Sequence, residues 1–327
     1  MHVHRPRSVF YHHPCIDGST AAWAVHKALG EQARYIGLDH AEQDDITDKI
    51  LHNVTAETVA VFVDFAPAPH VLNDILDHVQ GIEIYDHHVS AMRALTEFQD
   101  HPKVKMTFDL DRSGAGLAYD IFSLHSGRPL FIDLVERVDL ARGEQFDSPD
   151  QFFLVSSFIN TMDVTRPLDH VFADIDELCQ INDIHEFERR GAPARRQYQR
   201  QIRRTLEAVD YMNLSMLKYG RGLTNIPAVH GHIGNLGHEF IPRLLALCPH
   251  QFRMGVIWSY QTDDMITMSL RSDKEIDVSM IAVELADAFG LSGGGHHNIA
   301  AVRFTVDQFH DFAMKAGLYF DKKAPRI

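Results

Sequence analysis

Short apolar runs alternate with segments of helical spacing along the first part of the chain, and this alternation limits the folds that it can adopt. The strand-like runs are residues 8–11, 33–38, 58–65 and 82–85, and the helical segments are residues 20–29, 70–79, 113–124 and 130–140. Nearly continuous apolar runs are typical of strands in a parallel sheet, because helices cover both of its faces. The pattern predicts an α/β fold with a doubly wound, mainly parallel sheet in the N-terminal domain.

Acidic residues and histidines follow three of these strand-like runs. His12, His13 and Asp17 come after the first run, Asp64 closes the third, and Asp86-His87-His88 follow the fourth. In doubly wound sheets ligands bind beyond the carboxyl ends of the strands, so we expect these side chains at one edge. Carboxylates and imidazoles together suit divalent metal ions. A solvated turn is the alternative interpretation of Asp86-His87-His88 taken alone.

The pattern of strands and helices restarts after residue 225 as a smaller α/β unit. A chain of 327 residues is longer than one compact core usually holds, which favours two domains. We therefore predict an N-terminal domain over residues 1–190, a helical linker over residues 191–224 and a C-terminal domain over residues 225–327.

Residues 186–212 form a polar segment that is rich in arginine. Arg196, Arg200 and Arg204 recur at four-residue spacing and would share one face of a helix. A solvated linker helix is the favoured interpretation, and a stripe of arginines that faces an anion is the alternative.

The composition excludes several classes of protein. The formal net charge of −14 argues against a broad surface for long nucleic acid, because such binding neutralises many phosphates. The three cysteines lack Cys-x-x-Cys spacing and indicate neither a disulfide framework nor a zinc ribbon. No uncharged apolar stretch reaches the roughly 18 residues of a membrane span, and the N-terminus shows no apolar signal segment. We therefore expect a cytoplasmic protein.

The run Gly293-Gly294-Gly295-His296-His297 is predicted to be a flexible loop that carries imidazoles and grips an anion. A flexible glycine linker is the alternative interpretation. At Gly294 and Gly295 an anion would meet the backbone without interference from a Cβ atom. Combined with the acidic and histidine residues, this run indicates metal-assisted chemistry on a phosphate.

In order and separation these motifs resemble the DHH phosphoesterase superfamily, specifically its two-domain branch with a DHH and a DHHA1 domain, which includes nanoRNase or oligoribonuclease-like phosphodiesterases. The resemblance spans nearly the whole chain. It rests on residues 11–18, residues 61–64, Asp86-His87-His88, the helix that ends at Asp139, residues 270–272 and residues 293–301. It implies a DHH metal-binding domain joined by a helical linker to a DHHA1 substrate-binding domain.

The resemblance also implies two divalent metal ions, expected to be Mn²⁺, with Mg²⁺, Co²⁺ or Zn²⁺ as alternatives. The implied metal ligands are His13, Asp17, Asp64, His87 and Asp139. Among them, Asp64 resembles the carboxylate that bridges both ions, and His13 resembles a ligand of one ion. The other three resemble ligands of the second ion.

Further roles follow from the same resemblance. The implied catalytic residues are Asp64, Asp86, His87 and His88. The implied substrate-binding residues are His88, Arg271, Gly294, Gly295, His296 and His297. His88 resembles the residue that contacts the scissile phosphate, while Asp86 orients the neighbouring imidazoles. Of the two C-terminal histidines, the spacing to the family's Ala-Ala pair favours His297.

The chain departs from the family pattern at two places. His13 is preferred to His12 as a metal ligand because Asp17 sets the register of the family motif His-x-Asp-x-Asp-Gly. In that register Cys15 replaces the first aspartate of the motif. The first ion is then expected to have fewer oxygen ligands, to be bound with the help of His12, or to be bound by the Cys15 thiolate, which favours zinc. A small buried side chain is the alternative interpretation of Cys15. The family's Ala-Ala-Gly segment reads Ala-Ala-Val at residues 300–302.

The expected function is a phosphodiesterase that hydrolyses very short oligonucleotides or linear dinucleotides such as pGpG to mononucleotides, through a two-metal-activated hydroxide. The alternatives within phosphate chemistry are a bisphosphonucleotide, polyphosphate or pyrophosphate phosphatase and a cyclic-nucleotide or cyclic-dinucleotide phosphodiesterase. A non-catalytic nucleotide-binding protein is the alternative from another class. The expected partner is the short substrate, with no long nucleic acid and no membrane, and a homodimer remains open.

Overall fold

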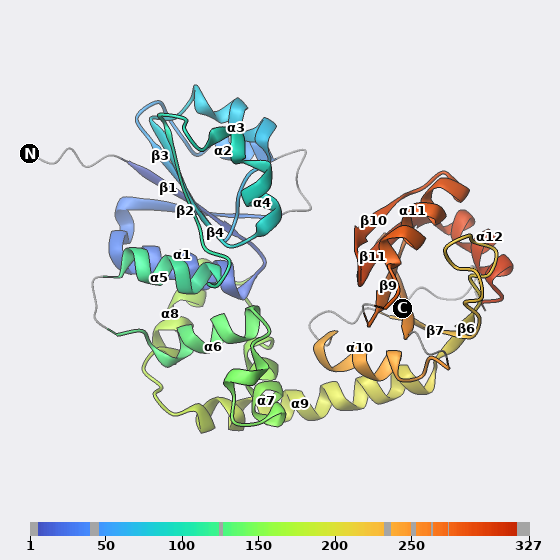
Figure 1. Cartoon of the computed structure of the whole chain (residues 1–327). Coiled ribbons are helices and arrows are strands. Elements are labelled where there is room, and N and C mark those ends of the chain that lie inside the picture. The colour runs from blue at the N-terminus through green and yellow to red at the C-terminus, as the bar shows by residue number, and fades with distance from the viewer. Residues whose placement is uncertain are drawn as a thin grey trace, which may run out of the picture. The chain divides into compact units, whose positions relative to one another are not determined.

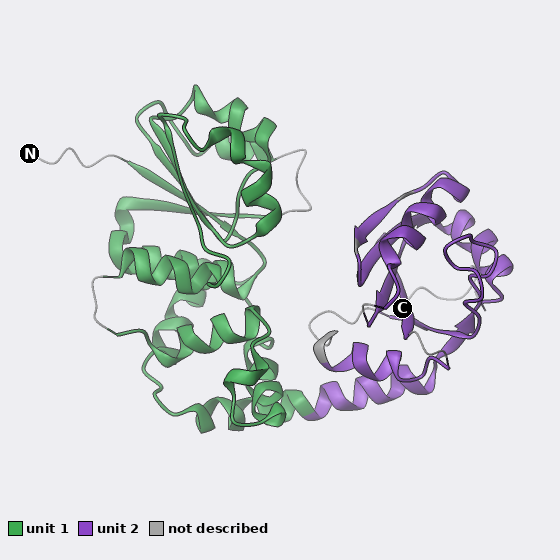
Figure 2. Ribbon diagram, viewed as in Figure 1, with its two compact units in different colours: residues 1–195 green, residues 196–327 purple. Residues whose placement is uncertain are grey.

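The computed structural model divides the chain into two compact units, Met1–Arg195 and Arg196–Ile327 (Figure 2). Each unit has a sheet and a hydrophobic core of its own. The structure describes residues 6–39, 46–123, 127–231, 237–249, 253–262, 264–273 and 275–318, without the side chains of residues 237, 238, 292 and 296.

A five-stranded sheet forms the centre of the first unit, with the strand order β2-β1-β3-β4-β5. Its strands are β1 (Arg7–His12), β2 (Ala33–Leu38), β3 (Val59–Val63), β4 (Gly81–Asp86) and β5 (Val104–Phe108). All neighbouring strands are parallel. Since β2 lies on one side of β1 and the later strands lie on the other, the strand order reverses at β1. Ligands bind beyond the carboxyl ends of the strands at such a reversal.

Helices cover both faces of this sheet (Figure 1). They are α1 (Ile16–Leu29), α2 (Ile46–Leu51), α3 (Pro69–Leu76), α4 (Val89–Ala94) and α5 (Gly114–Phe122), with 3₁₀ turns at Gly30–Gln32 and Thr96–Phe98. Strand side chains alternate between the faces, so Val9 and Tyr11 pack with α1 and α5 whereas Phe10 packs with α2 and α3. The α/β fold class with a parallel N-terminal sheet is confirmed.

Further helices extend the first unit beyond its sheet. They are α6 (Leu130–Asp139), α7 (Pro149–Ile159) and α8 (Leu168–Leu178), with a 3₁₀ turn at Gly143–Gln145. Phe131, Val155 and Ile175 join these helices to the core under α1 and α5. Ser148 caps α7 by accepting a hydrogen bond from the Gln151 amide. No helix in the described part of the chain combines the length and the apolarity of a membrane span.

The division between the two units falls inside α9 (Ile184–Glu207). Phe187 of this helix belongs to the core of the first unit, and Ile202 belongs to a core in the second. The predicted linker, residues 191–224, also contains β6 (Asp210–Met212), which is a strand of the second sheet. A strand of three residues is too short to show a periodic pattern, so the sequence gives no signal for it.

A six-stranded mixed sheet forms the second unit, with the order β10-β11-β9-β8-β7-β6. Its other strands are β7 (Ile226–His230), β8 (Met254–Tyr260), β9 (Met265–Ser272), β10 (Ser292–His296) and β11 (Ile299–Thr305), and its helices are α10 (Gly237–Leu245), α11 (Val278–Phe289) and α12 (Val306–Ala316). Only β7 and β8 are parallel among the described pairs. Leu270, Leu285 and Val302 are buried in its core.

The glycine run of the second unit is part of a strand, which corrects the prediction of a flexible loop. Gly293, Gly294 and Gly295 lie in β10 and pair with β11 at the edge of the sheet. At Gly295 the backbone φ angle is +151°, and a Cβ atom would lie 2.4 Å from the carbonyl oxygen of Ile299. Glycine is therefore required at residue 295 for the close approach of the two strands. The backbone hydrogen bonds to β11 hold the glycine run in an extended conformation, although glycine itself is conformationally free.

Candidate metal centre

The end of β1 and the start of α1 bring an imidazole and a carboxylate to the carboxyl edge of the first sheet. His12 is the last residue of β1, and Asp17 lies in the first turn of α1 with only 1% of its surface exposed. A Cβ atom on Gly18 would lie 2.2 Å from the carbonyl oxygen of His12. Helix α1 can therefore begin this close to the strand only because residue 18 is a glycine.

Asp64 directly follows β3 and is the most central of the acidic groups. It is 1% exposed, and its φ angle of 52° lies in the left-handed region, which is costly for residues other than glycine but is tolerated by aspartate. Its Oδ2 atom lies 3.4 Å from Nδ1 of His12, and its Oδ1 atom lies 3.2 Å from Nε2 of His87. Burial favours the neutral acid, but the two imidazoles outweigh burial and lower the pKa of Asp64 to about 2.

Asp86, the last residue of β4, holds the two histidines that follow it. Its Oδ1 atom accepts a hydrogen bond from the backbone amide of His87 at 2.7 Å and lies 2.7 Å from Nδ1 of His88. The hydrogen bond to Asp86 raises the pKa of His88 to about 9. Asp86 therefore fixes the orientation of the two residues that follow it.

Three carboxylates meet at the Nε2 atom of His87. This atom lies 3.2 Å from Asp64, 3.7 Å from Asp139 and 4.0 Å from Asp17. Asp139 is the last residue of α6, and its side chain is 30% exposed. Burial and the charge of Asp64 raise the pKa of Asp139 to about 6, and the same two causes raise the pKa of Asp17 well above its usual range.

The start of α5 forms part of the same site, although it is not among the predicted site residues. A Cβ atom on Gly114 would lie 2.3 Å from the Cβ atom of Asp64, and the Ala115 amide donates a hydrogen bond to Oδ1 of Asp17 at 3.1 Å. Ser113 caps the helix by accepting a hydrogen bond from the Gly116 amide. The sequence signal was a run of small residues after a capping serine, which is typical of a helix start that lies close to another segment.

Cys15 lies beside His12 and Asp64, with its sulfur atom among their potential ligand atoms. Burial and the negative charges of Asp64 and Asp17 raise the pKa of the thiol. The thiol is therefore protonated at neutral pH unless a cation lies beside it.

The structure places His12, rather than His13, beside Asp64. The ring of His13 packs against Tyr11, with their centroids 6.0 Å apart, and a Cβ atom on Gly37 of β2 would lie 2.7 Å from the Cβ atom of His13. The structure therefore brings together four of the five predicted metal ligands and leaves out His13. Those four are Asp17, Asp64, His87 and Asp139.

These donors fit a divalent metal ion. Oδ2 of Asp17 and both carboxylate oxygens of Asp64 are buried and accept no hydrogen bond from any residue that the structure describes. Carboxylates buried so close together repel one another, and a cation between them removes that repulsion. Three groups of side chains have potential ligand atoms within 4.8 Å of one another. Asp64 belongs to two of them, one with Asp86, His87 and His88 and the other with His12 and Cys15. The third group consists of Asp17, His87 and Asp139. Nitrogen and carboxylate ligands suit Mn²⁺ and Zn²⁺ alike, so the site does not select the ion.

The second unit holds Arg271, which was predicted to bind a phosphate. It lies in β9 and pairs with Ile299 of β11. Its Nε atom is buried and has no hydrogen-bond partner among the described residues. Burial also lowers the pKa of the guanidinium group. Arg271 therefore presents a buried donor that an anion would satisfy.

The glycine run and the two histidines after it lie near Arg271 in the sheet register. His296 pairs with Ile299, the same residue that pairs with Arg271, although the side chain of His296 lies outside the described structure. Nδ1 of His297 lies 3.4 Å from Oδ2 of Asp277. A Cβ atom on Gly294 would meet no atom within 4 Å, so the backbone there is open.

Residues 249–320 match the family model described as the DHHA1 domain. The chain contains a DHHA1 domain. This domain includes Arg271, the glycine run and His297, and it is consistent with the DHH/DHHA1 phosphoesterase superfamily that the sequence motifs resemble. It also points to a hydrolase of the DHH phosphoesterase type.

Two solved structures align with nearly the whole length of this chain. An uncharacterized protein from Helicobacter pylori G27 is 12% identical with a TM-score of 0.33, and the alignment covers 94% of this chain and 97% of that one. CDC45 from Entamoeba histolytica is 7% identical with a TM-score of 0.48, and the alignment covers 95% of this chain and 94% of that one. At these values neither likeness bears on the function. A comparison with curated proteins found no match.

Proposed function

We propose that this protein is a metal-dependent phosphodiesterase that hydrolyses very short oligonucleotides or linear dinucleotides such as pGpG to mononucleotides. The DHHA1 domain supports a phosphoesterase of the DHH type. The observation that carries the proposal is the position of Asp64. Its buried carboxylate lies between His12 and His87, and neither oxygen accepts a hydrogen bond from the described residues. Such a carboxylate is suited to be shared by two cations.

The residues around Asp64 fall on two sides of its carboxylate. His12 lies on the side of Oδ2 with Cys15 grouped beside it, and His87 lies on the side of Oδ1 with Asp17 and Asp139 around it. These residues would hold divalent ions, which would supply a water molecule of lowered pKa and neutralise charge on phosphate oxygens. The chain's own residues set the position of the reacting phosphate.

His88 is the residue that we assign to the scissile phosphate. Asp86 binds the ring through Nδ1, so the Nε2 edge of His88 faces away from Asp86. The hydrogen bond to Asp86 raises the pKa of His88 and so favours the protonated ring, which carries a positive charge. A protonated imidazole in this orientation donates to a phosphate oxygen and stabilises the charge that develops there.

Arg271 is assigned to another phosphate of the substrate. Its guanidinium group is half-buried, and a phosphate oxygen would satisfy the buried Nε donor. The open backbone at Gly294 lets a phosphate approach without a side chain in the way. These contacts favour substrates with a terminal phosphate.

The test is a screen of manganese-loaded protein against 5′-phosphorylated dinucleotides, cyclic dinucleotides, a bisphosphonucleotide, pyrophosphate and polyphosphate. We expect release of mononucleotides from the linear dinucleotide. Asp64→Asn should abolish this activity and lower the bound metal measured by elemental analysis. Asp74→Asn, at an exposed position of α3, is the matched control and should change neither. Activity of Asp64→Asn within about tenfold of the wild type would reject the assignment of Asp64, because even residues outside the metal's immediate ligands cost roughly 10–100-fold.

A nucleotide-binding protein without catalysis is the second candidate, and Cys15 is the observation that favours it. A protonated, partly buried thiol beside His12 is a poor substitute for a carboxylate in holding a hard ion. The two candidates differ in metal content. Two ions per chain with hydrolysis support the enzyme, whereas one ion or none with retained nucleotide binding supports the second candidate.

A further inference from the structure

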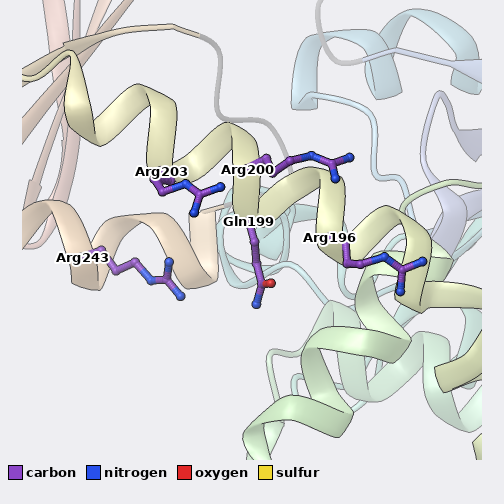
Figure 3. Close-up of a pocket in the computed structure, with 5 residues that line it drawn as sticks. All are labelled: Arg196, Gln199, Arg200, Arg203 and Arg243. Atoms are coloured by element: carbon purple, nitrogen blue, oxygen red, sulfur yellow. The ribbon is translucent and has the colours of Figure 1, made fainter.

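A pocket in the second unit is lined almost entirely by arginine. Its lining residues are Arg196, Gln199, Arg200 and Arg203 of α9 and Arg243 of α10, around a volume of about 540 Å³ (Figure 3). The two helices meet through Ile202 and Phe240, which are buried in a shared core. Both helices that line the pocket are therefore held in place by packing.

Most of these arginines have no acidic partner. Arg243 forms an ion pair with Glu239 at 2.5 Å. Among the described residues, the side chains of Arg196, Arg200 and Arg203 form no ion pair or hydrogen bond. Elsewhere on the same helix, by contrast, Arg190 pairs with Glu186. In a chain with a net charge of −14 acidic residues are abundant, yet no acidic residue in the described part of the chain pairs with these three guanidinium groups.

The chemistry of the lining indicates what the pocket binds. Guanidinium forks match phosphate oxygens, and several of them in one pocket favour a ligand with several negative charges. No aromatic or aliphatic side chain lines the described pocket, so nothing there would stack on a base or hold a lipid chain. The bound part of the ligand is therefore its phosphate groups.

The row of arginines on α9 indicates the length of the ligand. From Arg196 to Arg203 the helix rises by about 10 Å, at roughly 1.5 Å per residue. A single phosphate group cannot span this row, whereas linked phosphates can contact successive guanidinium groups. Figure 3 shows Arg203 and Arg243 on the side of α9 that carries Gln199.

We infer that this pocket binds a di- or triphosphate group, supplied by an inorganic oligophosphate or by the phosphate chain of a nucleotide. The site is formed by the second unit alone and uses none of the residues assigned to the metal centre or to Arg271. It is therefore independent of the proposed hydrolysis.

Calorimetric titration of the full-length protein in EDTA tests the inference, because chelation removes metal-dependent binding elsewhere. The probes are tripolyphosphate, ATP and orthophosphate. Tripolyphosphate or ATP should bind clearly more tightly than orthophosphate, and the tighter of the two identifies the source of the phosphate chain. Affinity should fall as salt is added, because salt screens these exposed charges. Equal affinity for orthophosphate, or preferred binding of a single-stranded oligonucleotide, would overturn the inference.

Substitutions locate the binding to the pocket. Arg203→Gln should weaken tripolyphosphate or ATP binding by about 10-fold, and Arg196→Gln with Arg203→Gln by about 100-fold, as expected for lost charge-assisted hydrogen bonds. Arg204→Gln is the matched control, because it removes the same charge from α9 outside the lining. These side chains are exposed, and circular dichroism checks that each variant keeps the fold. Unchanged affinity in the double variant, or an equal loss in the control, would reject the pocket as the site.

Discussion

The start of α5 touches the end of β3 so closely that a Cβ atom on Gly114 would lie 2.3 Å from the Cβ atom of Asp64. No side chain fits between them, so the backbone of Gly114 forms one wall around the buried carboxylate. The position of α5 and the geometry of Asp64 are therefore coupled.

This coupling predicts the effect of Gly114→Ala. The added methyl group must displace Asp64, so bound metal and activity should fall by roughly 10–100-fold. Overpacking should lower the free energy of unfolding by about 1–3 kcal/mol, measured by urea titration. Gly127→Ala is the matched control, since a Cβ atom there meets nothing within 4 Å. If Gly114→Ala keeps full metal content and activity, α5 does not constrain Asp64.

The two neighbouring histidines after β1 should differ in their effect on the metal centre. His12 lies 3.4 Å from Asp64, whereas His13 packs against Tyr11. We expect His12→Ala to weaken manganese binding by at least about tenfold, as for loss of a residue that holds the metal. His13→Ala should have a smaller effect, and a manganese titration of both variants measures the difference. The opposite order would restore His13 as the ligand.

Replacement of the thiol should change the metal requirement. Cys15→Asp places a hard oxygen donor beside His12 and Asp64, so it should lower the manganese concentration that half-saturates activity. In EDTA the same variant should melt at a lower temperature than the wild type, because the new carboxylate is partly buried and repels Asp64 beside it. Added manganese should reverse this loss. Cys15→Ser, which adds no charge, is the control, and an equal gain in metal affinity there would refute the role of the carboxylate.

Arg271 should affect capture of substrate rather than metal binding. A hydrogen bond to a charged group contributes about 1.5–3 kcal/mol, so Arg271→Ala should weaken binding of a 5′-phosphorylated dinucleotide by roughly 10- to 150-fold. Metal content should not change. Arg303→Ala, at an exposed position of β11 in the same sheet, is the control.

A second substrate sharpens this prediction. For a dinucleotide without the terminal phosphate, Arg271→Ala should have little effect, because the contact that it removes is absent there. Equal losses of affinity on both substrates would show that Arg271 supports the fold or contacts the scissile group.

The sequence predicts the first sheet and much of the metal centre for one physical reason. Parallel strands buried on both faces appear as apolar runs, and polar residues that follow them must gather at one edge. This reasoning brings Asp64 and His87 together from separate strands. The strand pattern did not predict Asp139, because an acidic residue at the end of a helix has no comparable signal in the sequence. Asp139 was predicted only from the resemblance to the family.

Other features depend on contacts that no local pattern encodes. Spacing cannot decide which of two adjacent histidines turns toward Asp64, since that depends on how the chain leaves β1. The glycine run looked flexible, but pairing with β11 makes it a strand. The arginine spacing on α9 gave no sign of Arg243, which reaches the pocket from another helix.

Because α9 supplies Phe187 to one core and Ile202 to another, a division of the chain before Phe187 or after Ile202 leaves one of these cores incomplete. A fragment that starts at residue 225 would lose Ile202 and leave the apolar side chains of Phe240 and Leu244 without their neighbour. A fragment that ends before Phe187 would expose the ring's partners, Phe131 and Phe158. A deletion that also removes Phe187 from the first half or Ile202 from the second would expose apolar side chains and leave the remaining half prone to aggregation.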